Sequence, residues 1–106
     1  MINLEEFKNL ELVVGRIIEA EEVEKSDKLL KLKVDISTEE RQIIAGIGKQ
    51  YEPEELINRE IIVIANLEPK ILFNLESQGM LLAANDEGEP ILLQPDKEVP
   101  VGTRIS

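Results

Sequence analysis

The chain has 106 residues, of which 42% are apolar and only 3% aromatic, a composition typical of one folded domain rather than of a disordered or membrane-spanning protein. It contains no Cys and no His, which excludes disulfides, thiolate and imidazole nucleophiles and most transition-metal sites. The formal net charge of −10 argues against a nucleic-acid ligand, because phosphate binding depends on Lys and Arg.

The start of the chain predicts a short helix followed by a long strand. Asn3 is a candidate N-cap and Glu6 stands three residues later, as in a capping box. Apolar residues recur at helical spacing, so we expect this helix to cover one end of the core. The β-branched segment Leu12 to Glu24 predicts a long, bent strand, in which Gly15 indicates a bulge or a close approach of neighbouring backbone.

The segment KLLKLKVDI predicts a half-buried strand with a basic outer face, because apolar and polar side chains alternate along it. The inward residues are Leu30, Leu32 and Val34, and the outward residues are Leu29, Lys31 and Lys33. After the turn-like STEE, the segment RQIIAGI predicts a third strand that begins at Arg41.

The second half of the chain predicts one helical turn and several more strands. In YEPEEL, Pro53 occupies a favoured first helical position and two acids follow it. The apolar run Ile61 to Ala65 predicts a strand that is covered on both faces. GMLLAA and PILLQP predict two short strands around the turn from Asn85 to Gly88.

This order of elements predicts an all-β fold in a single domain spanning residues 1–106. Short strands with one helix between the third and fourth are typical of an OB-fold, a five-stranded barrel, here with extra strands at the C-terminus. A β-sandwich is the alternative, but the helix position and the bent first strand favour the barrel. Function has to be argued separately, because one fold serves many functions.

Several function classes find no support in the residues. The 22 acidic residues are spread over strands and loops without the paired carboxylates that acid–base catalysis uses, so we expect no enzyme and no cofactor or metal. The N-terminus lacks the basic flank and apolar core of a signal peptide, and no apolar window reaches a membrane-spanning length. We therefore expect a cytoplasmic protein without membrane association.

The charge is unevenly distributed along the chain. The segment Lys25 to Lys49 holds six of the twelve basic residues and four acids, so it is locally basic between acidic flanks. Lys28, Lys31 and Lys33, with Arg41 on the next strand, form a surface for phosphates or an ordinary solvated face. Few aromatic side chains are available for stacking, which disfavours a generic single-strand binder and leaves recognition of a structured RNA.

Four polar or flexible residues have both a functional and a structural interpretation. Asn66 follows a strand and either reads a base edge or caps a turn. Ser77 and Gln78 either hold their loop together or offer hydrogen bonds outward. Met80, the only methionine besides Met1, is either an exposed contact or part of the core.

The segments KLLKL, RQIIAGI, YEPEEL, ANLEP and SQGMLLAA occur together, in this order and spacing, in a known family. From about Phe7 to Ile105 the chain resembles the stand-alone tRNA-binding domains. These are similar to the C-terminal appendage, or separate β subunit, of methionyl-tRNA synthetase, and more distantly to a synthetase cofactor of eukaryotes. The resemblance implies an OB-fold homodimer that binds tRNA by its overall shape.

The resemblance also implies which residues face the tRNA. These are Lys31, Arg41, Asn66, Ser77 and Met80, and the charge pattern adds Lys28 and Lys49. Met80 would be a flexible apolar contact in a loop ordered by Ser77 and Gly79. The dimer surface is expected around the apolar segments PILLQP and VPVG near the C-terminus.

The chain departs from the family in two respects. Glu24, Lys25 and Ser26 stand where the family usually has His-Pro, and the overall charge is unusually acidic. The second departure predicts that fewer than about six cations engage phosphates and that binding is lost as salt rises.

Three roles remain open from the sequence. A free tRNA-binding protein and a β subunit that delivers tRNA to the catalytic chain of methionyl-tRNA synthetase have the same sequence features. A peptide-binding export chaperone from a related branch is the alternative. That branch differs where this chain has AGIGKQY and ANLEP.

Overall fold

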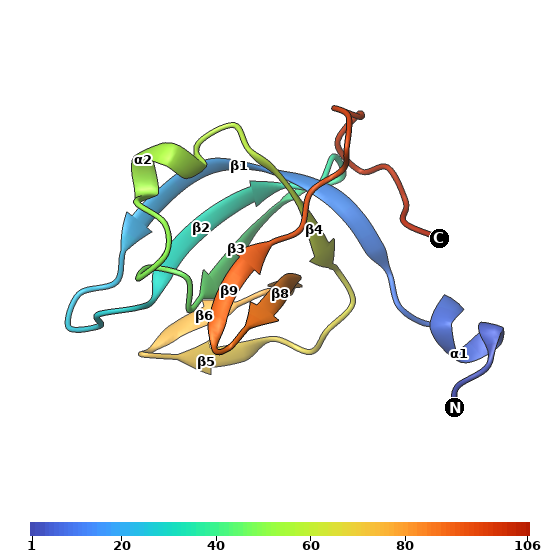
Figure 1. Cartoon of the computed structure of the whole chain (residues 1–106), viewed down its shortest axis with the longest axis horizontal. Coiled ribbons are helices and arrows are strands. Elements are labelled where there is room, and N and C mark those ends of the chain that lie inside the picture. The colour runs from blue at the N-terminus through green and yellow to red at the C-terminus, as the bar shows by residue number, and fades with distance from the viewer.

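The computed structural model describes all residues from Met1 to Ser106. Its centre is a five-stranded antiparallel sheet, in the order β3-β2-β1-β4-β7, that curls into a nearly closed barrel (Figure 1). These strands are β1 (Leu12–Glu22), β2 (Leu30–Asp35), β3 (Glu40–Ala45), β4 (Glu60–Ile64) and β7 (Met80–Leu81). The short helix α2 (Pro53–Leu56) lies between β3 and β4. The predicted barrel with this helix position is confirmed.

The barrel core follows from the alternation predicted for β2 and the continuous apolar run predicted for β4. Leu30, Leu32 and Val34 are buried, with at most 1% of their surface exposed. From Ile61 to Val63 every residue of β4 is buried. Leu29 is also buried although it points to the outer face, because a hairpin of two short strands packs over it.

This hairpin, β5 (Lys70–Leu72) with β6 (Leu75–Ser77), was not predicted from the sequence. Leu72 and Leu75 from it cover a small second core made of Val23, Leu29 and Ile44. The hairpin strands have three residues each, too few for a periodic pattern to stand out. A second hairpin, β8 (Ala83–Asp86) with β9 (Glu89–Leu92), forms a separate two-stranded sheet.

The first strand bends, as predicted, and two of its positions, Gly15 and Ile18, explain the bend. A Cβ at Gly15 would lie only 2.6 Å from Cγ1 of Val34, so the close approach at this glycine is by a side chain rather than by the neighbouring backbone that was predicted. The pairing register of β1 with β2 shifts between Ile17 and Glu19, which leaves Ile18 as the extra residue of a bulge. The strand ends at Glu22, two residues before the predicted end.

The N-terminal helix α1 (Leu4–Lys8) forms where predicted, but its predicted contact with the core is wrong. The capping box is present, since the backbone N–H of Glu6 donates to Oδ1 of Asn3 over 2.9 Å. No residue of α1 is buried, and the helix projects beyond the barrel (Figure 1). A five-residue helix is defined by its cap, and its apolar spacing does not specify which surface it contacts.

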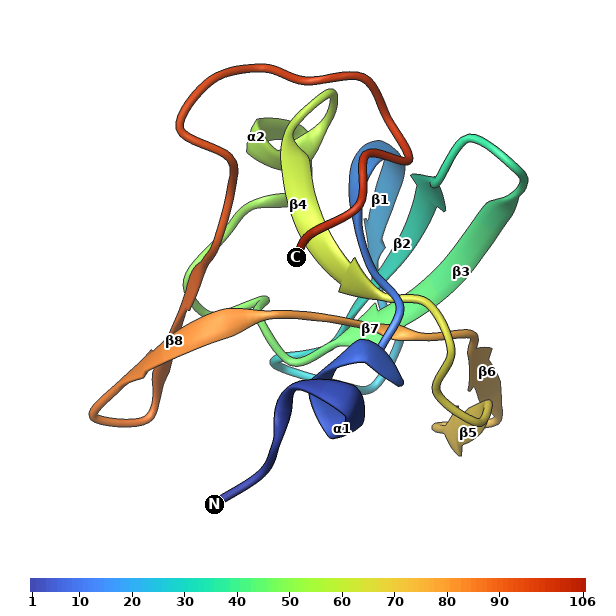
Figure 2. The ribbon, with the colours of Figure 1, turned by 90° about the vertical axis from the view of Figure 1, so that its right-hand side faces the viewer.

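The C-terminal segment returns to the barrel and pairs with β1. It passes α2 and runs back alongside β1 and β4 (Figure 2). The N–H of Val14 donates to the carbonyl of Thr103 over 2.9 Å, and the N–H of Ile105 donates to the carbonyl of Leu12 over 2.9 Å. Neither helix of the chain is long and apolar enough to cross a membrane.

Candidate nucleic-acid interface

The outer face of β1, β2 and β3 is hollowed into an open groove of about 930 Å³. It is lined by Ile18 to Glu21 of β1, Lys31 to Lys33 of β2, Glu40 to Gln42 of β3, and by Ile57 and Gln78. Among the residues implied to face tRNA, the groove brings together only Lys31 and Arg41. The others lie elsewhere. Ser77 and Met80 lie at the barrel seam, where β6 and β7 complete the barrel, Lys28 and Lys49 lie in loops, and Asn66 lies beside the N-terminal segment.

The lysines of the groove are paired with carboxylates on the neighbouring strands. Glu21 is the register partner of Lys31, and its carboxylate lies 2.7 Å from Nζ of that lysine. Lys33 lies 3.2 Å from Glu19 and 3.9 Å from Glu40. These pairs are exposed, so each stabilises the fold little. They nevertheless cancel much of the positive charge of the groove.

The pairing of Lys33 also affects its protonation. The hydrogen bond to Glu19, together with the negative charges of Glu19 and Glu40, raises the pKa of Lys33 above its ordinary value of 10.5. Lys33 is therefore fully charged at neutral pH, and its charge is held by the protein's own carboxylates.

Arg41 is bonded to the protein rather than directed into solvent. Its Nη1 donates to the carbonyl of Ala65 over 2.8 Å and to that of Gln78 over 2.9 Å. Its Nε lies 3.0 Å from Oε1 of Glu39, and only 20% of the side chain is exposed. Arg41 thus ties β3 to the chain just after β4 and just after β6.

The side chains of Ser77 and Gln78 accept hydrogen bonds from backbone N–H groups of β3, in place of part of the usual strand-to-strand backbone pairing. Ser77 is 2% exposed, and its Oγ accepts from the N–H of Ile44 over 3.0 Å and donates to the carbonyl of Gly79. The N–H of Gln42 donates to Oε1 of Gln78 over 2.9 Å. These bonds join β3 to the segment between β6 and β7, so Ser77 supports this loop from inside the barrel wall.

Asn66 lies away from the groove and anchors the N-terminal segment. Its Oδ1 accepts from the N–H of Glu11 over 2.9 Å, and its Nδ2 donates to the carbonyl of Asn9 over 2.7 Å. Both ends of the amide are therefore used within the protein. Asn66 thus holds the chain before β1 against the turn after β4, which is neither the turn cap nor the free amide considered from the sequence.

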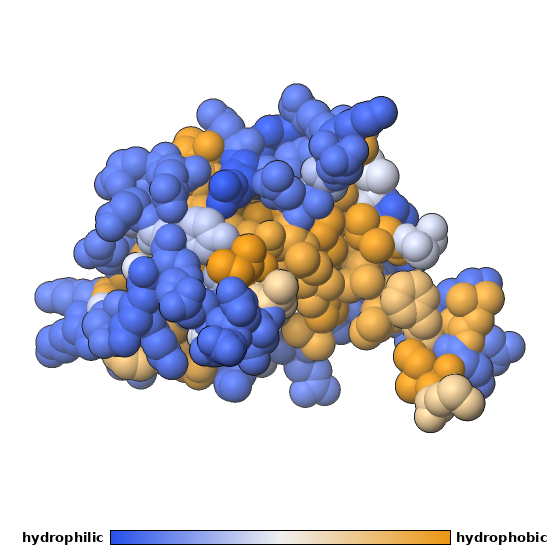
Figure 3. Space-filling view, viewed as in Figure 1, coloured by the Kyte–Doolittle hydropathy of each residue, from blue (hydrophilic) through white to orange (hydrophobic).

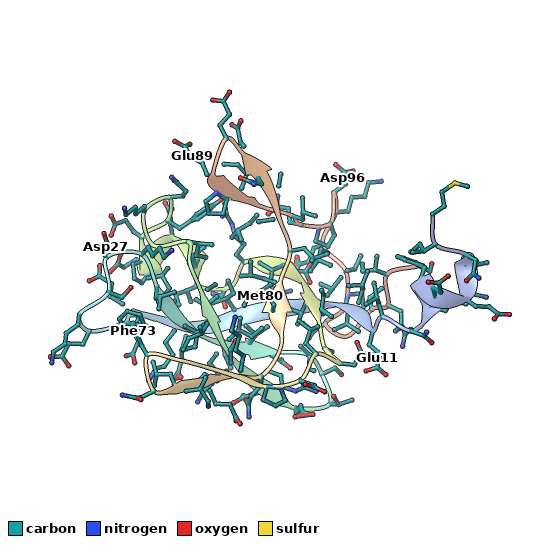
Figure 4. All side chains as sticks on the ribbon, turned by 90° about the horizontal axis from the view of Figure 1, so that it is seen from below. Glu11, Asp27, Phe73, Met80, Glu89 and Asp96 are labelled. Atoms are coloured by element: carbon teal, nitrogen blue, oxygen red, sulfur yellow. The ribbon has the colours of Figure 1, made fainter.

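Met80 is half-buried at the start of β7 and packs against the barrel core. It is the register partner of Ile64, and Figure 4 shows it near the middle of the underside of the molecule. Gly79 precedes it with φ of +128°, and a Cβ there would lie 2.9 Å from the carbonyl oxygen of Ile64. The Gly-Met pair thus lets β7 approach β4 closely, while part of the Met80 side chain stays exposed.

Lys28 and Lys49 lie at the loop end of the barrel, outside the groove. The N–H of Gly48 donates to the carbonyl of Lys28 over 2.7 Å, which holds the β1–β2 loop against the segment after β3. Lys49 lies 3.4 Å from Asp27. Lys25 and Lys28 are exposed and take part in none of the ion pairs.

Sequence reasoning missed the acidic side of this surface. Glu19 and Glu21 alternate along β1 and therefore point to the same face as the lysines opposite them. The alternation of acids in IIEAEE was available in the sequence, but their pairing with Lys33 and Lys31 depends on the register that the bulge at Ile18 sets.

Comparison with known proteins agrees with the resemblance drawn from the sequence. Residues 12–104 match a family model described as "Putative tRNA binding domain". The methionine–tRNA ligase of Methanothrix thermoacetophila is 56% identical over 105 residues, which cover 99% of this chain and 16% of the ligase. The chain thus spans about a sixth of the length of the curated relatives it matches.

Two solved structures resemble the chain over its whole length. A protein from Pyrococcus horikoshii described as related to methionyl-tRNA synthetase has a TM-score of 0.94 and 40% identity, and the match covers 100% of this chain and 98% of that one. The chaperone CsaA of Bacillus anthracis has a TM-score of 0.90 and 35% identity, covering 100% and 99%. The family match spans nearly the whole chain, and the chain therefore belongs to the tRNA-binding domain family related to methionyl-tRNA synthetase.

Proposed function

We propose that this domain binds tRNA without catalysing a reaction, using the groove on β1, β2 and β3 together with the loop end beside it. The observation that carries the proposal is the family match over residues 12–104. The groove supports it by its shape, because it is open, extends across three strands and offers hydrogen-bonding side chains, although its lysines are paired with carboxylates. A structured RNA is recognised largely by such shape and phosphate contacts.

The residues implied by the family divide into two groups under this proposal. Lys28, Lys31 and Lys49 contact phosphates, and the exposed part of Met80 packs against the RNA. Arg41, Ser77 and Asn66 act indirectly, because their polar groups are bonded to backbone within the protein. Substituting them would weaken tRNA binding by disturbing the barrel seam and the N-terminal segment.

The domain is further proposed to act as a homodimer. On the face seen in Figure 3, apolar surface extends from the region of β9 toward α1. Exposed apolar side chains in this region include Leu4 of α1 and Ile91 of β9, with Leu10 after α1 and Leu93 after β9. A contiguous apolar area of this kind is typical of a protein interface. Two copies would present two RNA surfaces and raise the effective affinity.

Two settings fit this activity in the cytoplasm: a free tRNA-binding protein and a β subunit that brings tRNA to the catalytic chain of methionyl-tRNA synthetase. Co-purification with the synthetase would favour the subunit. The likeness to CsaA supports a second candidate function, a chaperone that binds peptides. Suppression of aggregation at sub-stoichiometric ratios, unaffected by added tRNA, would favour the chaperone.

The proposed function is tested by filter binding of unfractionated tRNA over a range of salt concentrations. We expect log K to fall linearly with log salt, and Lys28→Gln to reduce the slope by roughly 0.7 to 0.9, one phosphate contact. Lys97→Gln is the matched control, since Lys97 is exposed, has no ion-pair partner and lies in the C-terminal segment. No binding at low salt, or a response flat in salt, would refute the proposal.

A further inference from the structure

An exposed aromatic ring stands at the tip of the β5–β6 hairpin. Phe73 is 58% exposed and has φ of +49°, followed by Asn74 at +64°. Two consecutive residues with positive φ form the kind of tight hairpin turn that favours Asn and Gly. A bulky side chain is unfavourable at such a position. Since Leu72 and Leu75 make the packing contacts of the hairpin, folding does not explain the choice of Phe73.

The ring of Phe73 forms one side of a second hollow, of about 510 Å³. Leu75 and Val23 provide its other apolar lining, and its charged lining consists of Lys25, Lys31 and three acids, Glu21, Glu22 and Glu24. Figure 4 shows Phe73 at the same end of the molecule as Asp27 of the β1–β2 loop. The hollow therefore combines an aromatic face with both a cation and carboxylates.

This hollow adjoins the groove described above. Lys31 and Glu21 line both of them, so they share one wall. An RNA strand that follows the groove reaches Phe73 at its end. The unpaired cations Lys25 and Lys28 belong to the same loop end, which adds positive charge where the strand would leave the groove.

We propose that the hollow holds one unpaired base of the bound RNA, stacked on Phe73. This inference rests on the proposed function and adds a base-binding subsite to it. Unpaired bases stack on aromatic side chains and are read on their edges. Glu22 and Glu24 are acceptors only, so they suit a base that carries an exocyclic amino group. Lys25 would contact the adjoining phosphate. Cytosine, adenine and guanine have the required amino group, and uracil does not.

The first experiment compares tRNA binding by Phe73→Asn, Phe73→Trp and the wild type. Asn tolerates positive φ, so Phe73→Asn keeps the turn and removes the ring; we expect a thermal midpoint equal to or above that of the wild type. We expect its tRNA affinity to be about tenfold weaker, and Phe73→Trp to retain the affinity. Equal tRNA affinity of Phe73→Asn and the wild type would overturn the inference and leave the proposed function intact.

The second experiment uses Phe73→Trp as an optical probe, since the chain has no other Trp. We expect oligocytidylate to quench its fluorescence, and oligouridylate to do so only at much higher concentration. Ile71→Trp is the matched control, because Ile71 is 63% exposed on the same hairpin and does not line the hollow. Equal quenching of both variants, or equal responses to the two oligonucleotides, would contradict the proposed stacking and edge contact.

The two proposals fail in distinguishable ways. If the wild type binds no tRNA, the proposed function is lost, and the fluorescence titration still tests the hollow by itself. Quenching by an unfolded peptide but by neither oligonucleotide would overturn the inference in favour of a protein ligand.

Discussion

The cations of this protein occupy two regions that differ in what surrounds them. In the groove, Lys31, Lys33 and Arg41 are all bonded to acceptors within the protein. At the loop end, Lys25 and Lys28 have no ion-pair partner. A phosphate would have to displace a carboxylate from Lys31 or Lys33, but only water from Lys25 or Lys28. The number of basic residues along a strand therefore overstates how many are ready to bind RNA.

The largest expected effect is on stability, and it distinguishes Arg41, whose hydrogen bonds hold the fold together, from the exposed Lys28. Arg41→Met removes the donors to the carbonyls of Ala65 and Gln78, so we expect a loss of about 2 to 3 kcal/mol in the free energy of unfolding. Lys28→Met removes the same charge from an exposed side chain and should change it by less than about 0.5 kcal/mol. Urea denaturation measures both, and equal losses would contradict the distinction.

A smaller effect tests whether the carboxylates of the groove restrain its lysines. Glu21→Gln frees Lys31 from its partner at 2.7 Å, so we expect tRNA affinity to rise and the salt slope to steepen by roughly 0.7 to 0.9. Glu68→Gln is the matched control, with the same charge change at an exposed position between β4 and β5 and no ion pair to release. If both variants gain affinity equally, net charge rather than pairing governs binding.

The smallest effect concerns the protonation of Lys33. Glu19 raises the pKa of Lys33 most, and Glu40 adds to the shift. The small stabilisation that this pairing gives is therefore fully present below pH 10.5 and is lost as the pH rises through the raised pKa. Glu19→Gln should bring the pKa of Lys33 back toward 10.5, which an NMR titration of its side chain would detect. Stability near neutral pH should not depend on this titration. An unchanged pKa in Glu19→Gln would show that the two side chains are not paired in solution.

The barrel was predictable from the sequence because its determinants are local. The alternation in KLLKLKVDI, the run Ile61 to Ala65 and Pro53 before two acids each specify one element independently of the others. The contact of α1 was not predictable, because the spacing of its apolar residues defines a face but not the surface that it meets. The β5–β6 hairpin escaped prediction because its strands have three residues each and because Phe73 is not a usual residue at a position of positive φ.

The outward placement of Lys31 was predictable from the sequence, but the hydrogen-bond partners of the other candidate residues were not. The sequence placed Lys31 on an outer face, and the structure agrees. It could not show that Ser77, Arg41 and Asn66 use their polar groups within the protein, because their partners are distant in the chain. Such long-range hydrogen bonds form only where segments far apart in the sequence meet, so the pattern within one segment does not reveal them.

The path of the C-terminal segment has a consequence for attachment. Because this segment returns to pair with the start of β1, both chain ends leave the barrel on the side of α1, opposite the end that carries Phe73 (Figures 1 and 4). A tether at either terminus would therefore leave the groove and the loop end uncovered. Joined to another protein in this way, the domain would act as a mobile arm that raises the local concentration of RNA near its host without occupying the host's own surface.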